Sequence, residues 1–558
     1  MYTVHGENLS KTPWDCYPRP QMRRNSYVNL NGIWDFTVSH AEAFPESYDR
    51  KILVPFCPES PLSGLETHYP EGAYLFYRRT FSRPQTDGRI LLHIGAADQE
   101  LSCYVNSKKV GSHSGGYEAI TFDITAYLQE ENTLLLRCRD DLRRKEYPYG
   151  KQVMKRGGMW YTPVSGIWQT VWLESVPETY IQKLEITNRG DRVTICVSPP
   201  QEGMVTVADL GSYPLTDGRV EISPESPHFW SPEDPYLYEF SVQTSTDRVE
   251  SYFALRTLEV QTVDGIPRLC LNSKPYFFHG VLDQGYWPDG LFTPPHPQAY
   301  ADDILAMKKL GFNTLRKHIK VEAEEFYYQC DKLGMVVFQD MVNNGSYSFL
   351  QDTALPTLGK QKRKDHRRNR DPKVRQGFLD AMTATVNQLK NHPCILYWTI
   401  FNEGWGQFDS DRVYPQLKAL DDTRFIDTTS GWFRRKETDV ESLHIYFDRW
   451  GRLKPAQKPL VLSEFGGHTY AVEDHLWNPG KAYGYKTCKT PEAYRRSIET
   501  LYRSVIIPAV KKGLCAAIYT QLSDVEDEIN GFFTYDRKVN KADPETMQAI
   551  ARALFEAL

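Results

Sequence analysis

Cys394-Ile-Leu-Tyr-Trp-Thr-Ile-Phe401 is a short run of apolar and aromatic residues that leads directly into Asn402-Glu403-Gly404-Trp405-Gly406. A second run, Pro459-Leu-Val-Leu462, leads in the same way into Ser463-Glu464-Phe465-Gly466-Gly467. Runs of this length and composition are typical of strands that are buried in a parallel sheet. Each therefore predicts a buried strand that carries a glutamate at its C-terminal end.

Around these two runs, the C-terminal half of the chain alternates predicted strands with amphipathic stretches. Residues 300–310 and 374–390 have helical spacing of apolar residues. Strands are expected near residues 276–282, 314–319, 335–340, 395–401, 425–429, 443–446, 460–464 and 516–522. This alternation is the signature of parallel βα units, and eight of them close a (β/α)8 TIM barrel. Glu403 and Glu464 would then follow strands four and seven, on the face where such barrels bind substrate.

The N-terminal half reads as short alternating strands separated by turn residues, without helical period. Residues 27–174 predict one β-sandwich, and residues 177–261 predict a second whose length suits an immunoglobulin-like sandwich. We therefore expect three domains, at residues 1–176, 177–262 and 263–558. A length of 558 residues fits this number of domains.

Composition limits the class of protein. The formal net charge of −5 provides no positive field for nucleic acid or an anionic membrane. Ten cysteines occur without a Cys-x-x-Cys pair, and neither a secretory leader nor a bilayer-spanning stretch is visible. We expect a cytoplasmic protein with no structural zinc. Aromatic residues make up 13% of the chain; they suit stacking on sugars, but β-sandwiches also bury them.

Two motifs carry a resemblance to a known family. Tyr161-Thr-Pro-Val-Ser-Gly-Ile-Trp-Gln-Thr-Val-Trp-Leu-Glu174 is similar to the end of an N-terminal sugar-binding domain, and Asn402-Glu403 is similar to an acid/base motif. On these residues the chain resembles glycoside hydrolase family 2, which contains β-galactosidases, β-glucuronidases and β-mannosidases. In type it resembles the short bacterial β-galactosidase-like or β-galacturonidase-like members. The resemblance covers nearly the whole chain and implies that the first sandwich is a jelly roll.

The resemblance also implies a chemistry. Glu403 would be the acid/base and Glu464 the nucleophile of a retaining exo-β-glycosidase, with carboxyl groups about 5 to 5.5 Å apart. The two roles require different proton affinities. We expect hydrogen bonds from a Tyr or Arg to lower the pKa of Glu464, and a dry setting beside Trp405 to favour the protonated form of Glu403. Neither a metal nor a cofactor is expected.

Further site residues follow from the same resemblance. Asn402 would bind the 2-hydroxyl of the sugar, or else cap the strand end. Arg316 would lie beneath the nucleophile, or else form a structural ion pair. His444 and Tyr446 match a His-x-Tyr pair whose tyrosine contacts the nucleophile, with buried core aromatics as the alternative. Further candidates for the sugar site are Asp340, Asp283, Trp432, Asp524 and Glu526.

One segment departs from the family pattern. Many members read Arg-x-Ser-His-Tyr-Pro where this chain reads Arg316-Lys-His-Ile-Lys-Val. Lys317 and Lys320 would favour a sugar with a carboxylate at C5 through charge-assisted hydrogen bonds. Alternatively, they face solvent or pair with Glu322 and Glu324. The Asn-x-Lys signature by which β-glucuronidases bind their uronate is missing after the eighth strand, so a β-galactoside or β-galacturonide is the preferred substrate.

Other possibilities stay open on the sequence alone. β-Glucuronidase and β-mannosidase are the alternative specificities, a transglycosylase is another outcome of the same chemistry, and a non-catalytic carbohydrate-binding protein is the alternative from a different class. The basic run at residues 360–370 predicts a solvated loop on the catalytic face that is able to gate the site, bind an acidic neighbouring sugar or meet another subunit. We expect a carbohydrate substrate, no nucleic-acid or membrane partner, and either a monomer or a homo-oligomer.

Overall fold

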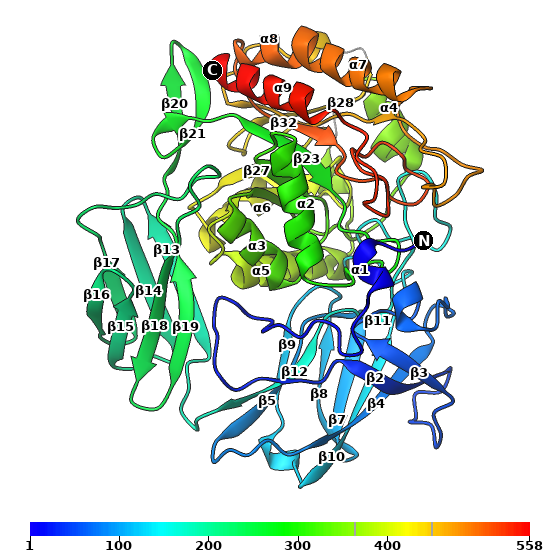
Figure 1. Cartoon of the computed structure of the whole chain (residues 1–558), viewed down its shortest axis with the longest axis vertical. Coiled ribbons are helices and arrows are strands. Elements are labelled where there is room, and N and C mark those ends of the chain that lie inside the picture. Colours follow the sequence, from blue (N-terminus) through cyan, green and yellow to red (C-terminus); the bar gives the residue numbers. More distant parts are fainter. Residues whose placement is uncertain (362–363, 448–449) are drawn as a thin grey trace.

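The computed structural model describes residues 1–361, 364–447 and 450–558. Figure 1 shows the N-terminal strands below, a second set of strands to one side, and the helix-rich C-terminal half above them. The fold class expected from the sequence, two β-sandwiches followed by a TIM barrel, is confirmed. The exact domain limits stay predictions; a hairpin of β20 (Leu258–Val263) and β21 (Ile266–Leu271) crosses the second of them.

Two antiparallel sheets form the first sandwich. The six-stranded sheet contains, in spatial order, β3 (Arg50–Val54), β2 (Gly32–Ser39), β4 (Tyr74–Ser82), β10 (Glu131–Arg139), β7 (Glu100–Val105) and β8 (Lys108–Ser114). The four-stranded sheet contains β1 (Val28–Asn29), β12 (Val171–Val176), β5 (Arg89–Ile94) and β9 (Ile120–Asp123). Side chains of both sheets, such as Trp34, Leu92 and Leu134, share one buried core. A small pair, β6 (Ala97–Asp98) and β11 (Gly166–Ile167), lies beside them.

The second sandwich has the three-plus-four strand division of an immunoglobulin-like domain. One sheet contains β13 (Lys183–Arg189), β14 (Arg192–Ser198) and β17 (Arg219–Ile222). The other contains β16 (Gly211–Leu215), β15 (Gly203–Val207), β18 (Tyr238–Thr244) and β19 (Arg248–Phe253). Buried and exposed residues alternate along β14, as expected for strands with one face on a core.

An eight-stranded parallel sheet forms the C-terminal barrel. Its order is β27 (Phe425–Ser430), β26 (Ile395–Asn402), β25 (Val336–Asp340), β24 (Thr314–Lys317), β23 (Phe278–Asp283), β32 (Leu514–Thr520), β29 (Leu460–Gly466) and β28 (Glu441–Ile445). A contact of 3.5 Å between the hydroxyls of Ser430 and Ser442 joins the two end strands. All eight strands expected from the sequence are present, with limits that differ by only a few residues.

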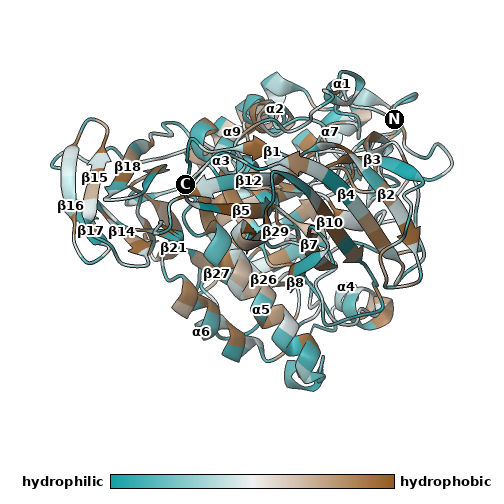
Figure 2. Cartoon of the chain, turned by 90° about the horizontal axis from the view of Figure 1, so that it is seen from below, coloured by the Kyte–Doolittle hydropathy of each residue, from teal (hydrophilic) through white to brown (hydrophobic). Residues whose placement is uncertain are grey.

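Helices surround this barrel. They are α2 (Gln298–Lys309), α3 (Glu324–Leu333), α5 (Pro372–Leu389), α6 (Ser410–Leu420), α7 (Pro491–Leu501), α8 (Ile507–Val510) and α9 (Pro544–Glu556). Short elements are α1 (Val4–Glu7), α4 (Leu355–Thr357), β22 (Lys274–Pro275), β30 (His468–Thr469) and β31 (Lys486–Thr487). Proline at the first position of α5, α7 and α9 follows a capping Asp371, Thr490 or Asp543, whose side chain accepts a backbone N–H. Figure 2 shows hydrophobic and hydrophilic residues alternating on α5 and α6, as in helices with one buried face.

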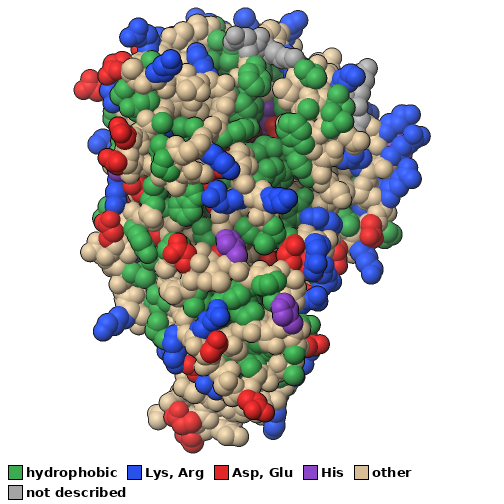
Figure 3. All heavy atoms as spheres, turned by 90° about the vertical axis from the view of Figure 1, so that its right-hand side faces the viewer, with side chains coloured by type: hydrophobic (Ala, Val, Ile, Leu, Met, Phe, Trp, Pro, Cys, Tyr) green, Lys and Arg blue, Asp and Glu red, His purple; other side chains and the backbone are tan. Residues whose placement is uncertain are grey.

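The molecular surface carries charges of both signs. On the face in Figure 3, Lys and Arg side chains are interspersed with Asp, Glu and hydrophobic side chains. No helix in the described ranges is long and apolar enough to cross a bilayer.

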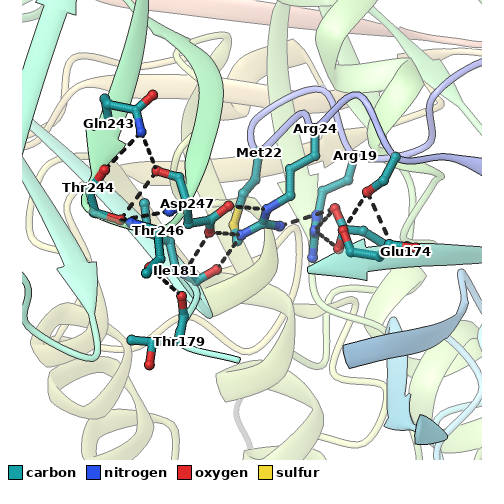
Figure 4. A network of polar contacts seen from close by, with 12 residues as sticks. Arg19, Met22, Arg24, Glu174, Thr179, Ile181, Gln243, Thr244, Thr246 and Asp247 are labelled. Carbon is teal, nitrogen blue, oxygen red and sulfur yellow. Dashed lines mark hydrogen bonds and ion pairs between the residues drawn. The ribbon is translucent and has the colours of Figure 1, made fainter. Parts of the chain in front are cut away.

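A buried ion network joins the two sandwiches (Figure 4). Arg24 donates through Nη1 to Glu174 of β12 at 3.1 Å and through Nη2 to Asp247, in the turn between β18 and β19, at 2.7 Å. Arg19 pairs with the other oxygen of Glu174 at 2.8 Å. Burial alone would raise the pKa of Glu174, but the charges of Arg19 and Arg24 lower it well below its usual range. The first sandwich is therefore fixed to the second by buried charged groups, each of which requires a partner of opposite charge.

We predict that Arg24→Met lowers the free energy of unfolding by about 3 kcal/mol, because it leaves the buried Asp247 without its cation. Urea unfolding followed by tryptophan fluorescence measures this. Arg192→Met is the matched control, since Arg192 pairs with Glu221 in an exposed ion pair whose loss should cost less than about 1 kcal/mol. Equal losses for both variants would contradict the role of the network.

The network also predicts a pH dependence. A carboxyl group whose pKa is lowered by folding contributes stability that is fully present above its unfolded pKa, about 4.3 for glutamate. For Glu174 this contribution should be lost as the pH falls further below that value. The free energy of unfolding of the wild type, measured between pH 7 and pH 3, would show this loss. If the stability of Arg24→Met fell equally steeply over this range, the prediction would be contradicted.

Candidate active site

Two carboxylates lie side by side at the C-terminal edge of the barrel strands. Glu403 directly follows β26, and Glu464 lies near the end of β29. The backbone of Glu403 has a φ of 50°, in the left-handed region, and its N–H donates to Ser430 O of β27 at 3.0 Å. At Gly406, a Cβ would lie 2.7 Å from the backbone oxygen of Asn344. The loop that presents Glu403 is thus held tightly against its neighbours.

His444 of β28 lies between the two glutamates. Its Nδ1 is 2.8 Å from Glu403 Oε1 and 3.5 Å from Glu464 Oε2. One ring nitrogen of His444 and one carboxylate oxygen from each glutamate all lie within 4.8 Å of one another, so the nearest carboxylate oxygens of the two glutamates are no further apart than that. Glu403 is 8% exposed and Glu464 4% exposed, so the pair is almost closed off from solvent.

Arg316 of β24 holds this arrangement from below. Its Nη1 donates to Glu464 Oε1 at 3.0 Å, its Nη2 to Asn402 Oδ1 at 2.9 Å, and its Nε to Asp340 Oδ1 at 3.0 Å. The guanidinium is completely buried. The structure therefore brings Arg316, Asn402 and Asp340 together with Glu464. Arg316 lies next to Glu464 and also forms a structural ion pair with Asp340, so the two alternatives given for it from the sequence are compatible.

Tyr446 contacts the second oxygen of Glu464. Its hydroxyl donates to Glu464 Oε2, and its ring stacks on Tyr485 with centroids 3.9 Å apart. Burial, together with the negative charges of Glu464 and Glu403, raises the pKa of Tyr446 well above its usual value, so the hydroxyl keeps the proton that it donates.

The surroundings of Glu464 favour its ionised form. Burial alone would raise its pKa, but the charges of His444 and Arg316 and the hydrogen bond from Tyr446 lower the pKa of Glu464 to about 2. This agrees with the lowering that the sequence led us to expect. Glu464 is therefore a carboxylate at any pH near neutrality.

His318 is a site residue that the sequence analysis did not single out. Its Nδ1 lies 2.8 Å from Asp340 Oδ2 and 4.0 Å from Glu464 Oε1. Burial lowers the pKa of His318 to about 4, so the ring is neutral at pH 7. Its position two residues after Arg316 was the available signal, because alternate strand residues face the same side.

Two tryptophans lie beside the carboxylates. The ring of Trp432 is 5.7 Å from that of His444, and Trp405 stacks on Trp160 of the first sandwich at 5.1 Å. Both indole N–H groups are buried without a hydrogen-bond partner in the described part of the chain. Buried donors of this kind usually have a partner, so each is suited to donate to a bound hydroxyl. Trp160, more than 200 residues away in sequence, left no local signal.

Lys317, Lys320 and Asp283 form a separate cluster of buried ion pairs, and their expected role as sugar-binding groups stays a prediction. Lys317 pairs with Asp283 at 2.5 Å and with Glu322 at 2.9 Å. Lys320 donates to Glu322 at 2.9 Å and to two backbone oxygens, those of Gly285 and Phe292, which uses all three of its N–H groups. Burial lowers the pKa of Lys320 to about 8. Both lysines pair with Glu322, which is one of the alternatives that the sequence left open for them.

The acids after the eighth strand have different partners. Asp524 pairs with the buried Lys541 at 2.6 Å, whereas Glu526 accepts the backbone N–H of Thr162 at 2.9 Å. Asp524 therefore serves the fold of its loop, and Glu526 fastens the first sandwich to the barrel. Their roles toward substrate stay predictions.

Glu528, not singled out from the sequence, lies in the same segment. It accepts a hydrogen bond from Tyr161 of the first sandwich at 2.5 Å. Burial raises the pKa of Glu528, and the nearby charge of Glu464 raises it further. Glu528 thus connects the first sandwich with the neighbourhood of Glu464.

The basic run at residues 360–370 lies between β25 and α5, although Lys362 and Arg363 fall outside the described residues. Within it, Asp365 accepts the backbone N–H of Ser410 at 3.0 Å, and Arg368 pairs with Asp352 at 3.1 Å. Part of the run is thus attached to barrel loops. Its role in gating or assembly stays a prediction.

One group of side chains has the geometry to hold a metal ion. Among the residues described, Glu403, His444 and Glu464 are the one trio of His, Cys, Asp or Glu whose ligand atoms come within 4.8 Å of one another. A cation there would be repelled by the Arg316 guanidinium, 3.0 Å from Glu464. The expectation that no metal or cofactor takes part stays a prediction.

A pair of close carboxylates at the C-terminal edge of a TIM barrel, one of them ionised and the other next to unpartnered indole donors, has the features of a glycoside hydrolase site. The family models described as "Glycosyl hydrolases family 2, TIM barrel domain" and "Glycosyl hydrolases family 2" match residues 267–542 and 181–256. The chain belongs to glycoside hydrolase family 2, and it is a glycoside hydrolase.

Two similar proteins are about a quarter identical to this chain over the aligned positions. A β-glucuronidase of Bacteroides fragilis is 25% identical over 81% of this chain and 70% of its own length. A β-galactosidase of Thermoanaerobacter pseudethanolicus is 23% identical over 80% of this chain and 62% of its own length. The structure of an Eisenbergiella tayi β-galacturonidase bound to galacturonate shares the fold, with a TM-score of 0.70 and 18% identity over 97% of this chain and 99% of that one.

We predict that Arg316→Lys lowers kcat/KM on an aryl glycoside by at least about 100-fold, because lysine keeps the charge but loses the planar set of donors. The pKa of Glu464 should rise from about 2 toward its usual value, so the acidic limb of the pH profile of kcat/KM should move to higher pH. Arg412→Lys, on the exposed face of α6, is the control. An acidic limb that does not move in Arg316→Lys would show that Arg316 does not set this pKa.

Proposed function

We propose that the protein is a retaining exo-β-glycosidase that hydrolyses a terminal β-linked hexose or hexuronic acid by double displacement. The observation that carries this proposal is the separation of at most 4.8 Å between the nearest oxygens of Glu403 and Glu464. Retaining enzymes hold their two carboxyl groups about 5–5.5 Å apart, whereas inverting enzymes need about 6.5–9.5 Å to admit a water molecule.

In the first step, Glu464 attacks the anomeric carbon. One carboxylate oxygen forms a bond to C1 while the bond from C1 to the glycosidic oxygen breaks, and Glu403 gives its proton to the departing oxygen. Arg316 and Tyr446 fix the orientation of Glu464 beforehand, so little rearrangement is required when the oxocarbenium-like transition state forms.

In the second step, Glu403 acts as the base. It takes a proton from a water molecule, whose oxygen bonds to C1 as the bond between C1 and Glu464 breaks. Two inversions at C1 give a product with the β configuration of the substrate. His444 Nδ1, 2.8 Å from Glu403, is placed to orient this carboxyl group in both steps.

Asn402 is suited to bind the sugar itself. Arg316 Nη2 donates to its Oδ1 at 2.9 Å, which fixes the side-chain amide with its NH2 group as the end that is left to donate. A hydrogen bond from this group to the 2-hydroxyl would strengthen as positive charge develops at C1. The unpartnered indole donors of Trp405 and Trp432 are suited to other hydroxyls.

The choice among sugars is the finer part of the proposal. A β-galactoside or β-galacturonide is preferred, and the names of the similar proteins, β-glucuronidase, β-galactosidase and β-galacturonidase, support a sugar of this kind. Values of kcat/KM on the 4-nitrophenyl β-galactoside, β-galacturonide, β-glucuronide and β-mannoside would identify it. A preference for the mannoside would contradict this choice of sugar but not the proposed mechanism.

We predict that Glu464→Gln lowers kcat by at least about 10⁴-fold on every substrate, because no covalent intermediate can form. Glu403→Gln should lose much less activity on 2,4-dinitrophenyl glycosides, whose leaving group needs no proton, than on alkyl glycosides. Added azide should restore turnover in both variants, giving the α-glycosyl azide with Glu464→Gln and the β-glycosyl azide with Glu403→Gln. Glu499→Gln, in an exposed ion pair on α7, is the control.

The stereochemistry of the wild-type reaction provides a second check. Proton NMR of the first product should show the β anomer before mutarotation. An initial α anomer, or substantial activity of Glu464→Gln without azide, would contradict the assignment of Glu464 as the nucleophile.

A further inference from the structure

A segment of the first sandwich reaches the mouth of the barrel. Between β10 and β11 the chain crosses to the loops that follow β24 and β25, where the N–H of Tyr149 donates to Asn343 O at 3.0 Å. A Cβ at Gly150 would lie 2.9 Å from the oxygen of Ile319, which shows how closely the two backbones approach. Lys151 is the next residue, and this contact brings it to the barrel mouth.

The ammonium group of Lys151 lies over two aromatic rings. Its Nζ is 5.2 Å from the ring centroid of Trp405, two residues after Glu403, and 5.7 Å from that of Tyr161. Lys151 is only 7% exposed. Nevertheless, across residues 1–361, 364–447 and 450–558, its Nζ makes no hydrogen bond and no carboxylate lies within 4.0 Å of it.

This sets Lys151 apart from the other buried lysines of the described chain. Lys317, Lys320 and Lys541 are also buried, and each has a carboxylate within 2.9 Å. The Nζ of Lys151 is not among the fully buried polar atoms that lack a partner in the described chain, so an anion in the site is able to reach it. Contacts with aromatic rings offset only part of the cost of taking a charge out of water. An anion that is bound during function would make up the difference.

The position of Lys151 relative to the carboxylates supports this reading. Burial lowers the pKa of His318, and the positive charge of Lys151 lowers it further. Burial raises the pKa of Glu528. The positive charge of Lys151 opposes this rise, and the negative charge of Glu464 adds to it. His318 lies 4.0 Å from Glu464, so the ammonium group is a neighbour of the reacting pair.

We infer that Lys151 is a specificity-determining residue, which binds the carboxylate of a hexuronide whose glycosidic bond lies at Glu403 and Glu464. This inference rests on the proposed function and names the substrate class within it. A carboxylate at C5 is the anion that a terminal pyranose can bring to the site while its C1 is held between the two glutamates. In this inference the positive charge that binds the uronate is that of Lys151, in the first sandwich, rather than that of Lys317 or Lys320 as the sequence suggested.

The test uses the full chain and substrates matched in pairs. The 4-nitrophenyl β-galacturonide differs from the β-galactoside only in having a carboxylate instead of a hydroxymethyl group, and the β-glucuronide and β-glucoside form the second pair. Lys151→Met removes the charge but keeps an unbranched side chain over Trp405, whereas Lys151→Arg keeps the charge. Lys155→Met removes an exposed charge from the same segment and serves as the control.

For Lys151→Met we expect kcat/KM to fall by about 10- to 150-fold on the preferred uronide, the range for a hydrogen bond to a charged group, and by less than about threefold on the matching neutral sugar. Lys151→Arg should retain more uronide activity than Lys151→Met, and Lys155→Met should behave as the wild type. Equal losses on both members of a pair, or a wild type that prefers the neutral sugars, would overturn the inference.

Calorimetric binding of galacturonate, glucuronate, galactose and glucose separates this inference from the proposed function. Lys151→Met should bind the preferred uronate at least about 10-fold more weakly and bind the neutral sugars unchanged. A wild type that binds a uronate in this way but cleaves no aryl glycoside would overturn the proposed function and support Lys151. If the wild type cleaves aryl glycosides but Lys151→Met binds the uronate as tightly as the wild type, the inference about Lys151 is overturned and the proposed function is supported.

Discussion

The guanidinium of Arg316 is the group on which the site depends. It is completely buried, and a buried guanidinium is stable only when oxygen atoms accept its N–H groups. Those oxygens belong to Asp340, Asn402, Ser463 and Glu464, toward the ends of three other barrel strands. A shift of any of these strands would leave a buried charge without its partner. The register of the barrel and the position of Glu464 are therefore fixed by the same need to satisfy the Arg316 guanidinium.

Much of this could be predicted from the sequence because it depends on strand ends. Each barrel strand ends in residues of recognisable chemistry, so Glu403, Glu464, Arg316 and Asp340 could be assigned to one edge before any coordinates were known. The same reasoning did not show how the side chain of Lys317 is oriented. Neighbouring residues of a strand face opposite sides, so Lys317 faces away from the barrel interior occupied by Arg316 and lies 4.1 Å from the ring of Phe326 on α3.

The orientation of Lys320 was not predictable for a related reason. After β24 the chain turns through Ile319, which has a φ of 41°, so the alternation of the strand no longer applies to the next residue. The contributions of Trp160, Tyr161 and Lys151 could not be predicted at all. They approach the carboxylates from a different domain, and contacts across more than 200 residues leave no periodic pattern in a single sequence.

The joint between the first sandwich and the barrel therefore has a consequence beyond support. Tyr161 donates to Glu528, the backbone N–H of Thr162 donates to Glu526, and Trp160 stacks on Trp405, two residues after Glu403, so the contact between the first sandwich and the barrel lies beside the candidate site. Exchanging only the barrel between two members of the family would join surfaces that were never selected for each other. The barrel and the segment of the first sandwich that contacts it would therefore have to be exchanged together to preserve these contacts.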